Sequence, residues 1–270
     1  MQIGICVNMN AKDSDDLGLD QIEYCKDIGI EYIELSLDRI MMLNNPDFVQ
    51  LEKRVVHGKL PCLACNNFIP SSVRVVGNTY NKEQFEAYIH MALPRAHALG
   101  ARKIVFGSAG ARTVPSDFPM EMARQQLLDR LNYIADVAEL YEIEIEVEHL
   151  NRYECNIINT FEESVALAKD VKRFNVKSIF DYYHFALSGE NDKLISQNEE
   201  WIGYMHFACT LGRHMPDIYD IQNLAPVLQN LSKCVYDDTF SLEAYFPDMI
   251  MNELKYANVI SALKTGLTHS

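Results

Sequence analysis

Basic residues are scarce in this sequence, where 24 Lys and Arg stand against 38 Asp and Glu and the formal net charge is -14. Binding to a nucleic-acid backbone depends on clustered Lys and Arg, and this chain has few to cluster. The same deficit argues against attraction to an anionic membrane surface. We therefore expect neither nucleic acid nor a membrane as a partner.

Long apolar runs are also absent, since no window approaches the roughly 18–20 apolar residues of a membrane helix. The first ten residues, "MQIGICVNMN", lack a charged leader followed by an apolar stretch. The seven cysteines are odd in number and irregular in spacing, which fits reduced thiols better than a disulfide framework. Cys62 and Cys65 form one C-x-x-C without a second pair to complete a zinc site, so we expect ordinary buried thiols. These absences predict a soluble, cytoplasmic protein.

No linker rich in Pro, Gly or Ser divides the 270 residues, and 48% of them are hydrophobic, enough for one large core. Short apolar runs alternate with helical patterns from end to end. Strands are expected at 3–8, 30–37, 60–68, 102–108, 142–150, 176–181, 202–208 and 239–246. Helices are expected at 20–29, at 81–100 with a kink at Pro94, at 119–141, after a capping box of Thr160 and Glu163, and at about 248–266.

Eight strands separated by helices, in a chain of this length, predict a (β/α)8 barrel that forms a single domain over residues 1–270. A doubly wound open sheet is the structural alternative. That fold usually carries G-x-G-x-x-G after the first strand, which is missing here, and there is no P-loop either.

In a (β/α)8 barrel the active site lies at the C-terminal ends of the strands. The last four predicted strands deliver Glu148, Asp181, His206 and Glu243 at or near those ends. Each residue alone has an ordinary interpretation as a turn, a solvent-facing acid or a core histidine. Four such groups at one mouth would repel each other and lose hydration, and a cation removes both problems. The set therefore predicts one divalent metal ion, with Mn, Mg or Co favoured over zinc because the ligands are rich in oxygen.

Side chains alternate along a strand, so Glu144, Glu146 and Glu148 should share the face that points into the barrel. Lys177 precedes Asp181 by four residues, as Glu144 precedes Glu148. We predict an ion pair between Glu144 and Lys177 near the barrel floor, and we find no partner for Glu146.

Four motifs give the chain a family resemblance. They are "EHLNRYE" (148–154), "DYYH" (181–184), "HFACTLGR" (206–213) and "LEAYF" around Glu243. Together they resemble the xylose isomerase-like superfamily of sugar isomerases and epimerases, and most closely the ketose 3-epimerases that act on tagatose and psicose. The chain departs from that group at His149, Tyr204 and Cys209, beside the main set.

The resemblance implies that Glu148, Asp181, His206 and Glu243 hold the metal, and that Glu148 and Glu243 also form the catalytic acid/base pair. Substrate contacts are implied for Glu154, His184 and Arg213, and a homo-oligomer (dimer or tetramer) for the protein. The implied reaction is proton abstraction next to a carbonyl through a metal-bound enediolate, most simply ketose 3-epimerisation.

Several alternatives stay open at this point. The substrate is a sugar or a sugar phosphate, and an aldose–ketose isomerase or an inosose-type dehydratase would use the same residues. A non-catalytic sugar-binding barrel is a further possibility, although binding alone needs no opposed carboxylates. A DNA-repair nuclease on this fold would need a basic face and more than these 8 histidines.

Overall fold

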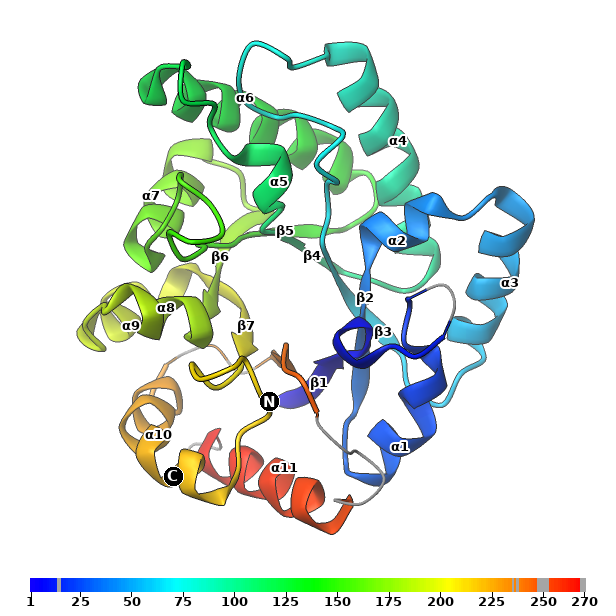
Figure 1. Cartoon of the computed structure of the whole chain (residues 1–270), viewed down its shortest axis with the longest axis vertical. Coiled ribbons are helices and arrows are strands. Elements are labelled where there is room, and N and C mark those ends of the chain that lie inside the picture. The colour runs from blue at the N-terminus through cyan, green and yellow to red at the C-terminus, as the bar shows by residue number, and fades with distance from the viewer. Residues whose placement is uncertain (14–15, 235, 237, 247–252, 268–270) are drawn as a thin grey trace.

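The strands form one closed parallel barrel in the computed structural model, which describes residues 1–13, 16–234, 236, 238–246 and 253–267 (Figure 1). The strands follow one another in chain order, and pairing of the last with the first closes the ring. Their bounds are β1 Gln2–Cys6, β2 Tyr32–Ser36, β3 Cys62–Asn66, β4 Lys103–Phe106, β5 Glu144–Val147, β6 Val176–Asp181, β7 Ile202–Phe207 and β8 Thr239–Leu242. The predicted barrel is confirmed, and each predicted strand overlaps one of these.

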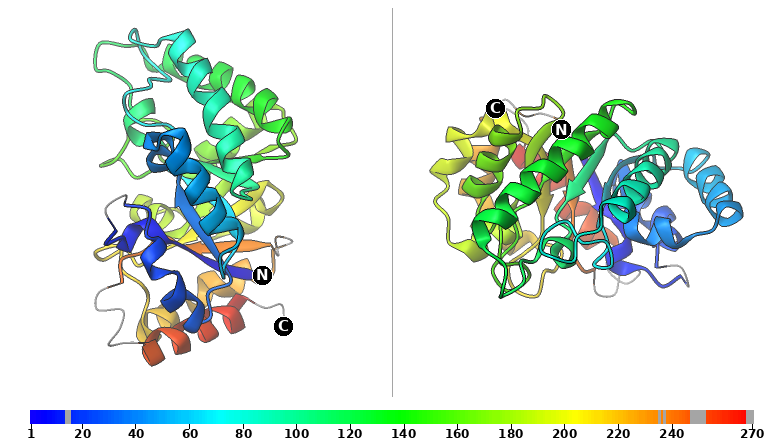
Figure 2. Two further views of the ribbon diagram at one scale, coloured as in Figure 1. Left: turned by 90° about the vertical axis from the view of Figure 1, so that its right-hand side faces the viewer. Right: turned by 90° about the horizontal axis from the view of Figure 1, so that it is seen from above.

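Helices cover the outside of the barrel, and α3, α4 and α6 lie in chain order along the side that is seen from above in Figure 2. The helices are α1 Ile22–Asp27, α2 Leu37–Met42, α3 Asn45–Val56, α4 Lys82–Ala98, α5 Ala109–Arg112, α6 Met120–Glu139, α7 Phe161–Val171, α8 Tyr182–Ser188, α9 Lys193–Gln197, α10 Ile218–Leu231 and α11 Glu253–Leu267. Three short 3-10 helices are η1 Val7–Asn10, η2 Leu19–Gln21 and η3 Glu199–Trp201. Helix α4 runs on past Pro94 to Ala98. The predicted start of the last helix, up to residue 252, lies outside the described residues.

The start of α7 shows how local sequence sets a helix boundary. Thr160 caps the helix, because its side-chain oxygen accepts the backbone N–H of Glu163 at 3.1 Å. The Glu163 carboxylate reaches back to the backbone N–H of Asn159 at 2.5 Å, one residue before the cap. The predicted pair of residues is therefore correct, but the second bond of the box falls one residue earlier than a standard capping box requires.

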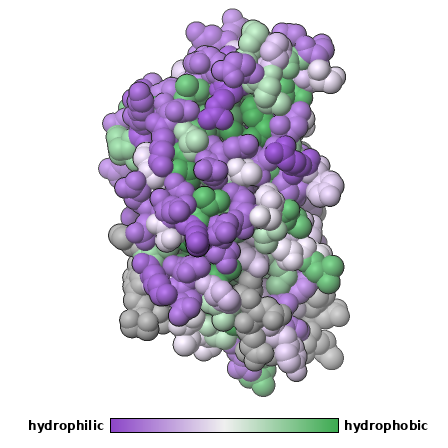
Figure 3. Space-filling model, turned by 90° about the vertical axis from the view of Figure 1, so that its left-hand side faces the viewer, coloured by the Kyte–Doolittle hydropathy of each residue, from purple (hydrophilic) through white to green (hydrophobic). Residues whose placement is uncertain are grey.

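The main apolar core lies between the strands and the helices, where the outward face of each strand packs against buried helix residues. A second, small apolar cluster fills the middle of the barrel interior and consists of Tyr32, Ala64, Val105, Ile179 and Tyr204. Outside the core, hydrophilic side chains predominate on the face that Figure 3 shows. Within the described residues, no helix combines the length and apolar character needed to cross a membrane.

The barrel floor, at the N-terminal ends of the strands, is organised around Lys103. Its ammonium group lies 3.1 Å from the Glu144 carboxylate and 3.0 Å from that of Asp238, and donates to the carbonyl oxygen of Gly203 at 2.6 Å. The predicted pair of Glu144 and Lys177 is therefore wrong. The strand register gives the reason, because Lys103 stands opposite Glu144 whereas Lys177 stands opposite Glu146.

Glu146 lies inside the barrel above this floor and is fully buried. Neither carboxylate oxygen has a hydrogen-bond partner among the described residues. A Cβ atom at Gly203 would come within 2.3 Å of one of these oxygens, so the glycine leaves the space that the carboxylate occupies. Burial raises the pKa of Glu146 to about 7, against the attraction of Lys103.

This raised pKa predicts that Glu146→Gln stabilises the protein at neutral and alkaline pH. The folded protein keeps the proton up to about pH 7, whereas the unfolded chain releases it near 4.5, so stability falls as the pH rises between these values. The difference corresponds to at most about 3 kcal/mol, which the variant should recover at about pH 8. Urea unfolding of both proteins at several pH values measures the gain.

The advantage of the variant should shrink as the pH falls and vanish below about 4.5, because the wild-type carboxyl is then neutral in both states. Glu144→Gln serves as the control, since this carboxylate is 42% exposed and pairs with Lys103, and it should show no gain at alkaline pH. Equal stability of wild type and Glu146→Gln at about pH 8 would contradict the assignment.

Candidate active site

The four predicted metal ligands meet at the opposite end of the barrel, which we call the mouth. Glu148 follows β5, Asp181 ends β6, His206 belongs to β7 and Glu243 follows β8. One ligand atom of each lies within 4.8 Å of the corresponding atoms of the other three. All four side chains are buried or nearly so, although they lie far apart in the sequence.

His206 stands at the centre of the group. Its Nδ1 atom lies 3.4 Å from Glu243 Oε2, 3.7 Å from Asp181 Oδ2 and 3.8 Å from Glu148 Oε1. This nitrogen has no hydrogen-bond partner among the described residues, although it is fully buried. An imidazole nitrogen surrounded by three carboxylates is the donor set of a divalent cation.

The orientation of the His206 ring depends on Glu34 of β2. His206 Nε2 lies 3.0 Å from both carboxylate oxygens of Glu34, which is fully buried. An ionised carboxylate can only accept, so Nε2 carries a proton, and Nδ1 is the ring nitrogen that is left for a metal ion. A carboxylate behind the distal nitrogen is the usual way in which proteins orient a metal-binding histidine.

Glu34 is held in turn by a network of buried hydroxyl groups. Tyr204 donates to its Oε2 atom at 2.7 Å, and Tyr204, Tyr32 and Ser241 contact one another at 2.7–3.1 Å. Glu34 was not among the site residues predicted from the sequence. A signal was available, because Tyr32, Glu34 and Ser36 alternate with apolar residues and so predict a polar inner face on this strand.

The charges of the group push the two predicted catalytic carboxyls in opposite directions. Burial acts against ionisation of Glu243, but Arg213 and His206 outweigh it and lower the pKa of Glu243 to about 2. Burial and the nearby Glu243 charge raise the pKa of Glu148. Two carboxyls whose proton affinities differ in this way are suited to exchange acid and base roles.

Two of the predicted substrate-contact residues, His184 and Glu154, are linked through Asn151. The backbone N–H of Asn151 donates to His184 Nδ1 at 3.1 Å, and its side-chain amide contacts the same nitrogen and Glu154 Oε1 at 3.0 and 2.8 Å. The proton of the His184 ring therefore lies on Nε2, which has no partner among the described residues and is 4.0 Å from Glu148 Oε1. His184 presents a donor to the space beside Glu148.

Arg213, the third predicted contact residue, extends into the same region from the segment after β7. Its guanidinium forms an ion pair with Glu243, lies 3.9 Å from Glu154 and stacks over the Tyr183 ring at 4.7 Å. The structure thus brings all seven predicted site residues to one mouth.

Two neighbouring features keep the end of β5 in place. The fully buried Arg112 donates to the carbonyl oxygens of Phe106 at 2.9 Å and Glu148 at 2.5 Å, a role that the sequence did not reveal. Asn159 donates to the carbonyl oxygens of Leu150 and Cys155 at 2.7 and 2.8 Å, which closes the loop that carries Asn151 and Glu154.

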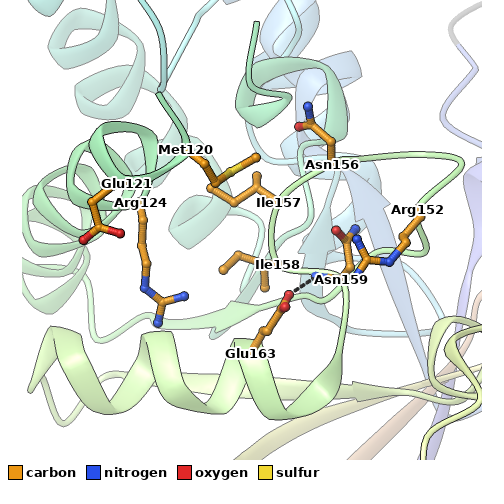
Figure 4. Close-up of a pocket in the computed structure, with 9 residues that line it drawn as sticks. All are labelled: Met120, Glu121, Arg124, Arg152, Asn156, Ile157, Ile158, Asn159 and Glu163. Carbon is orange, nitrogen blue, oxygen red and sulfur yellow. Dashed lines mark hydrogen bonds between the residues drawn. The ribbon is translucent and has the colours of Figure 1, made fainter. Parts of the chain in front are cut away.

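A separate pocket between α6 and this loop, shown in Figure 4, contains none of the seven predicted residues.

The three departures from the resembled motifs lie at the edge of the group. His149 is fully buried and burial lowers its pKa to about 3, so its ring is neutral. Tyr204 belongs to the network around Glu34. Cys209 lies beyond the end of β7 and outside the four-residue set.

Known proteins are similar to this chain in sequence and in structure. An inosose isomerase from Bacillus subtilis (strain 168) is 31% identical over 77 residues, and a D-psicose 3-epimerase from Agrobacterium fabrum is 38% identical over 64 residues. These matches cover 28% and 24% of this chain and 27% and 22% of the relatives, so each of the two matches spans about a quarter of the relative's length.

Two solved structures share the fold over nearly their whole length. A D-psicose 3-epimerase in the presence of D-fructose superimposes with a TM-score of 0.82 and 18% identity, over 99% of both chains. The IolI protein with a bound zinc atom superimposes with a TM-score of 0.70 and 18% identity, over 98% of this chain and 96% of that chain.

The family model described as "Xylose isomerase-like TIM barrel" matches residues 22–265, which include the whole four-residue set and all of the substrate-contact candidates. By this match and by its barrel, the chain belongs to the xylose isomerase-like TIM barrel family.

Proposed function

We propose that the protein is a divalent-metal-dependent sugar epimerase that inverts the carbon next to the carbonyl of a ketose, at C3. One observation carries the proposal. The mouth of the barrel joins three carboxylates to a buried histidine nitrogen that has no hydrogen-bond partner among the described residues. Such a set can form the ligand shell of a cation. Without a cation, burying these charged groups together would cost free energy.

Glu148, Asp181, His206 and Glu243 would hold this ion. Three oxygen ligands and one nitrogen favour Mn, Mg or Co, and four protein ligands leave positions free for substrate. When bound, the ion would polarise the substrate carbonyl and so make the C–H bond of the neighbouring hydroxyl-bearing carbon more acidic.

Glu148 and Glu243 come from different strands, β5 and β8, and in this proposal they face the reacting carbon from two sides. One carboxylate removes the C3 proton, and the other, in its acid form, delivers a proton to the opposite face. The carbon is inverted and no proton is gained or lost overall. The opposed pKa directions of the two groups, set by burial and by Arg213, suit them to this exchange.

His184, Glu154 and Arg213 would position the substrate. His184 Nε2 can donate to a sugar oxygen, and the free oxygen of Glu154 can accept from a hydroxyl. Arg213 is already engaged by the carboxylates of Glu243 and Glu154, so little of its charge is left for a phosphate. We therefore favour a free sugar over a sugar phosphate.

An inosose, which is a cyclic ketone with neighbouring hydroxyls, is the second candidate substrate. The inosose isomerase from Bacillus subtilis supports it, and the same pair of carboxylates would move the proton. The homo-oligomer and the cytoplasmic location that the sequence suggested stay predictions.

The reaction is tested by incubating the purified protein and Mn²⁺ with a panel of free ketoses, their phosphates and inososes in D2O. Deuterium at C3 of a free ketose, with formation of the C3 epimer, is the expected result. Deuterium at C1 or C2 would indicate an aldose–ketose isomerase, deuterium on an inosose ring the second candidate, and loss of water a dehydratase. Absence of exchange in every compound, with Mn²⁺ bound, would refute the proposal.

Replacing Glu243 by Gln should abolish turnover, because one of the two proton-transfer groups is lost. We expect kcat to fall by a factor of about 10²–10⁴. Glu144→Gln is the matched control, since this carboxylate lies at the barrel floor and its loss should change kcat less than about twofold. Turnover by Glu243→Gln at the wild-type rate would remove Glu243 from the chemistry.

Replacing Glu34 by Gln should weaken metal binding without removing a ligand. The neutral amide no longer increases the basicity of the His206 ring, and the affinity for Mn²⁺ should fall about 10–100-fold. Isothermal titration calorimetry of the metal-free protein measures this change. Glu31→Gln is the control, because this carboxylate lies just before β2, is 38% exposed and pairs with Lys264. An unchanged affinity in Glu34→Gln would show that the buried carboxylate does not support the histidine.

A further inference from the structure

A second group of metal-type side chains lies in the segment between β7 and α10. Cys209, His214 and Asp220 each place one ligand atom within 4.8 Å of the other two. None of them belongs to the set at the barrel mouth, and the donors differ in kind, because sulfur, nitrogen and oxygen meet here. Cys209 is 7% exposed and the other two are half-buried.

Hydrogen bonds to the backbone hold these three residues in place. The N–H of Cys209 donates to the carbonyl oxygen of His214 at 3.0 Å, which ties the first two together. Asp220 belongs to the capping box of α10, where one of its oxygens accepts the N–H of Asp217 at 2.8 Å. The Asp220 carboxylate also interacts with the Cys209 thiol, which places an oxygen of this group beside the sulfur.

The tautomer of His214 also suits metal binding. His214 Nδ1 lies 2.7 Å from the carbonyl oxygen of Met215, which can only accept, so Nδ1 carries the proton. The neutral ring then has its lone pair on Nε2. A backbone carbonyl behind one ring nitrogen is a common support for a histidine that binds metal through the other.

We propose that Cys209, His214 and Asp220 bind a zinc-type cation, separate from the ion at the barrel mouth. Thiolate and imidazole are the donors that zinc prefers, whereas the mouth offers mainly oxygen. Three protein ligands and one water complete a tetrahedral shell. Binding replaces the thiol proton of Cys209, which is released to solvent as the thiolate forms a bond to the metal.

The place of this site in the chain indicates its role. The segment between Cys209 and His214 carries Arg213, whose guanidinium contacts Glu243 and stacks on Tyr183. Gly212 and Arg213 both have left-handed backbone conformations, with φ of 71° and 49°, so this turn is tight. A cation at the base of the turn would hold Arg213 in position over the mouth.

Cobalt(II) provides the test, because a thiolate bound to cobalt gives a charge-transfer absorption in the near ultraviolet that oxygen and imidazole ligands do not give. The full-length protein is stripped of metal with a chelator and titrated with Co²⁺ alone. We expect this absorption in the wild type, saturating by two equivalents because the mouth also binds Co²⁺, and its loss in Cys209→Ser. Total cobalt per chain, measured by elemental analysis, should fall by one in the variant.

Cys6→Ser is the matched control, since Cys6 is the other thiol near candidate ligands, with its sulfur 3.9 Å from His206 Nε2. The Co²⁺ absorption of Cys6→Ser should equal that of the wild type. Absence of the band in the wild type, its persistence in Cys209→Ser, or its loss in Cys6→Ser would overturn the proposal.

A third variant keeps the test decisive if Cys209→Ser fails to fold, which circular dichroism reveals. Asp220→Asn leaves the thiol in place and should weaken Co²⁺ binding, read from the same band, at least about tenfold. An unchanged titration in this folded variant would equally overturn the site. Activity plays no part in these readouts, so failure of the epimerase proposal and failure of the second site are distinguishable.

Discussion

The pairing of β1 with β8 is the constraint on which the rest of the structure depends. Gln2 to Ile5 lie in register with Thr239 to Leu242, and this closes eight parallel strands into one ring. All strands then end at the same mouth, and the polar side chains at the ends of β5 to β8 meet there. Closure also brings Glu34 of β2 to within hydrogen-bond distance of His206 of β7. Ring closure thus brings together side chains that lie far apart in the sequence.

The barrel interior contains two charged regions, and the charges are balanced differently in each. At the floor, Lys103 balances Glu144 and Asp238, and Glu146 is accommodated by a raised pKa. At the mouth, negative charge exceeds what Arg213 and His206 balance, and the proposed cation supplies the rest. The middle layer of Tyr32, Ala64, Val105, Ile179 and Tyr204 lies between these regions. Its two tyrosine hydroxyls connect the apolar layer to Glu34, so one set of residues both fills the barrel and orients the histidine.

Much of this arrangement is predictable from the sequence, because strand periodicity and strand ends are local properties. The eight strands, the inward face of β5 and the four predicted metal ligands follow from patterns of a few residues, whereas the predicted substrate contacts Glu154, His184 and Arg213 came from the resemblance of the motifs to a family. Contacts between strands are not local. The partner of Glu144 depends on the register of β4 against β5, and the role of Glu34 depends on which strand lies across the barrel from it. Helices α2 and α3 follow β2 without having been predicted, and Arg112 acts through backbone carbonyls that carry no sequence signal.

The central claim is that His206 Nδ1, with Glu148, Asp181 and Glu243, holds one divalent ion at the mouth. Anomalous diffraction from crystals grown with Mn²⁺ tests it most directly, because the signal locates manganese without reference to the protein chemistry. The account predicts a peak at about 2.0–2.6 Å from Nδ1 and from one oxygen of each of the three carboxylates. A mouth without a peak at saturating Mn²⁺, or a peak bound through His206 Nε2 in place of the Glu34 contact, would contradict it.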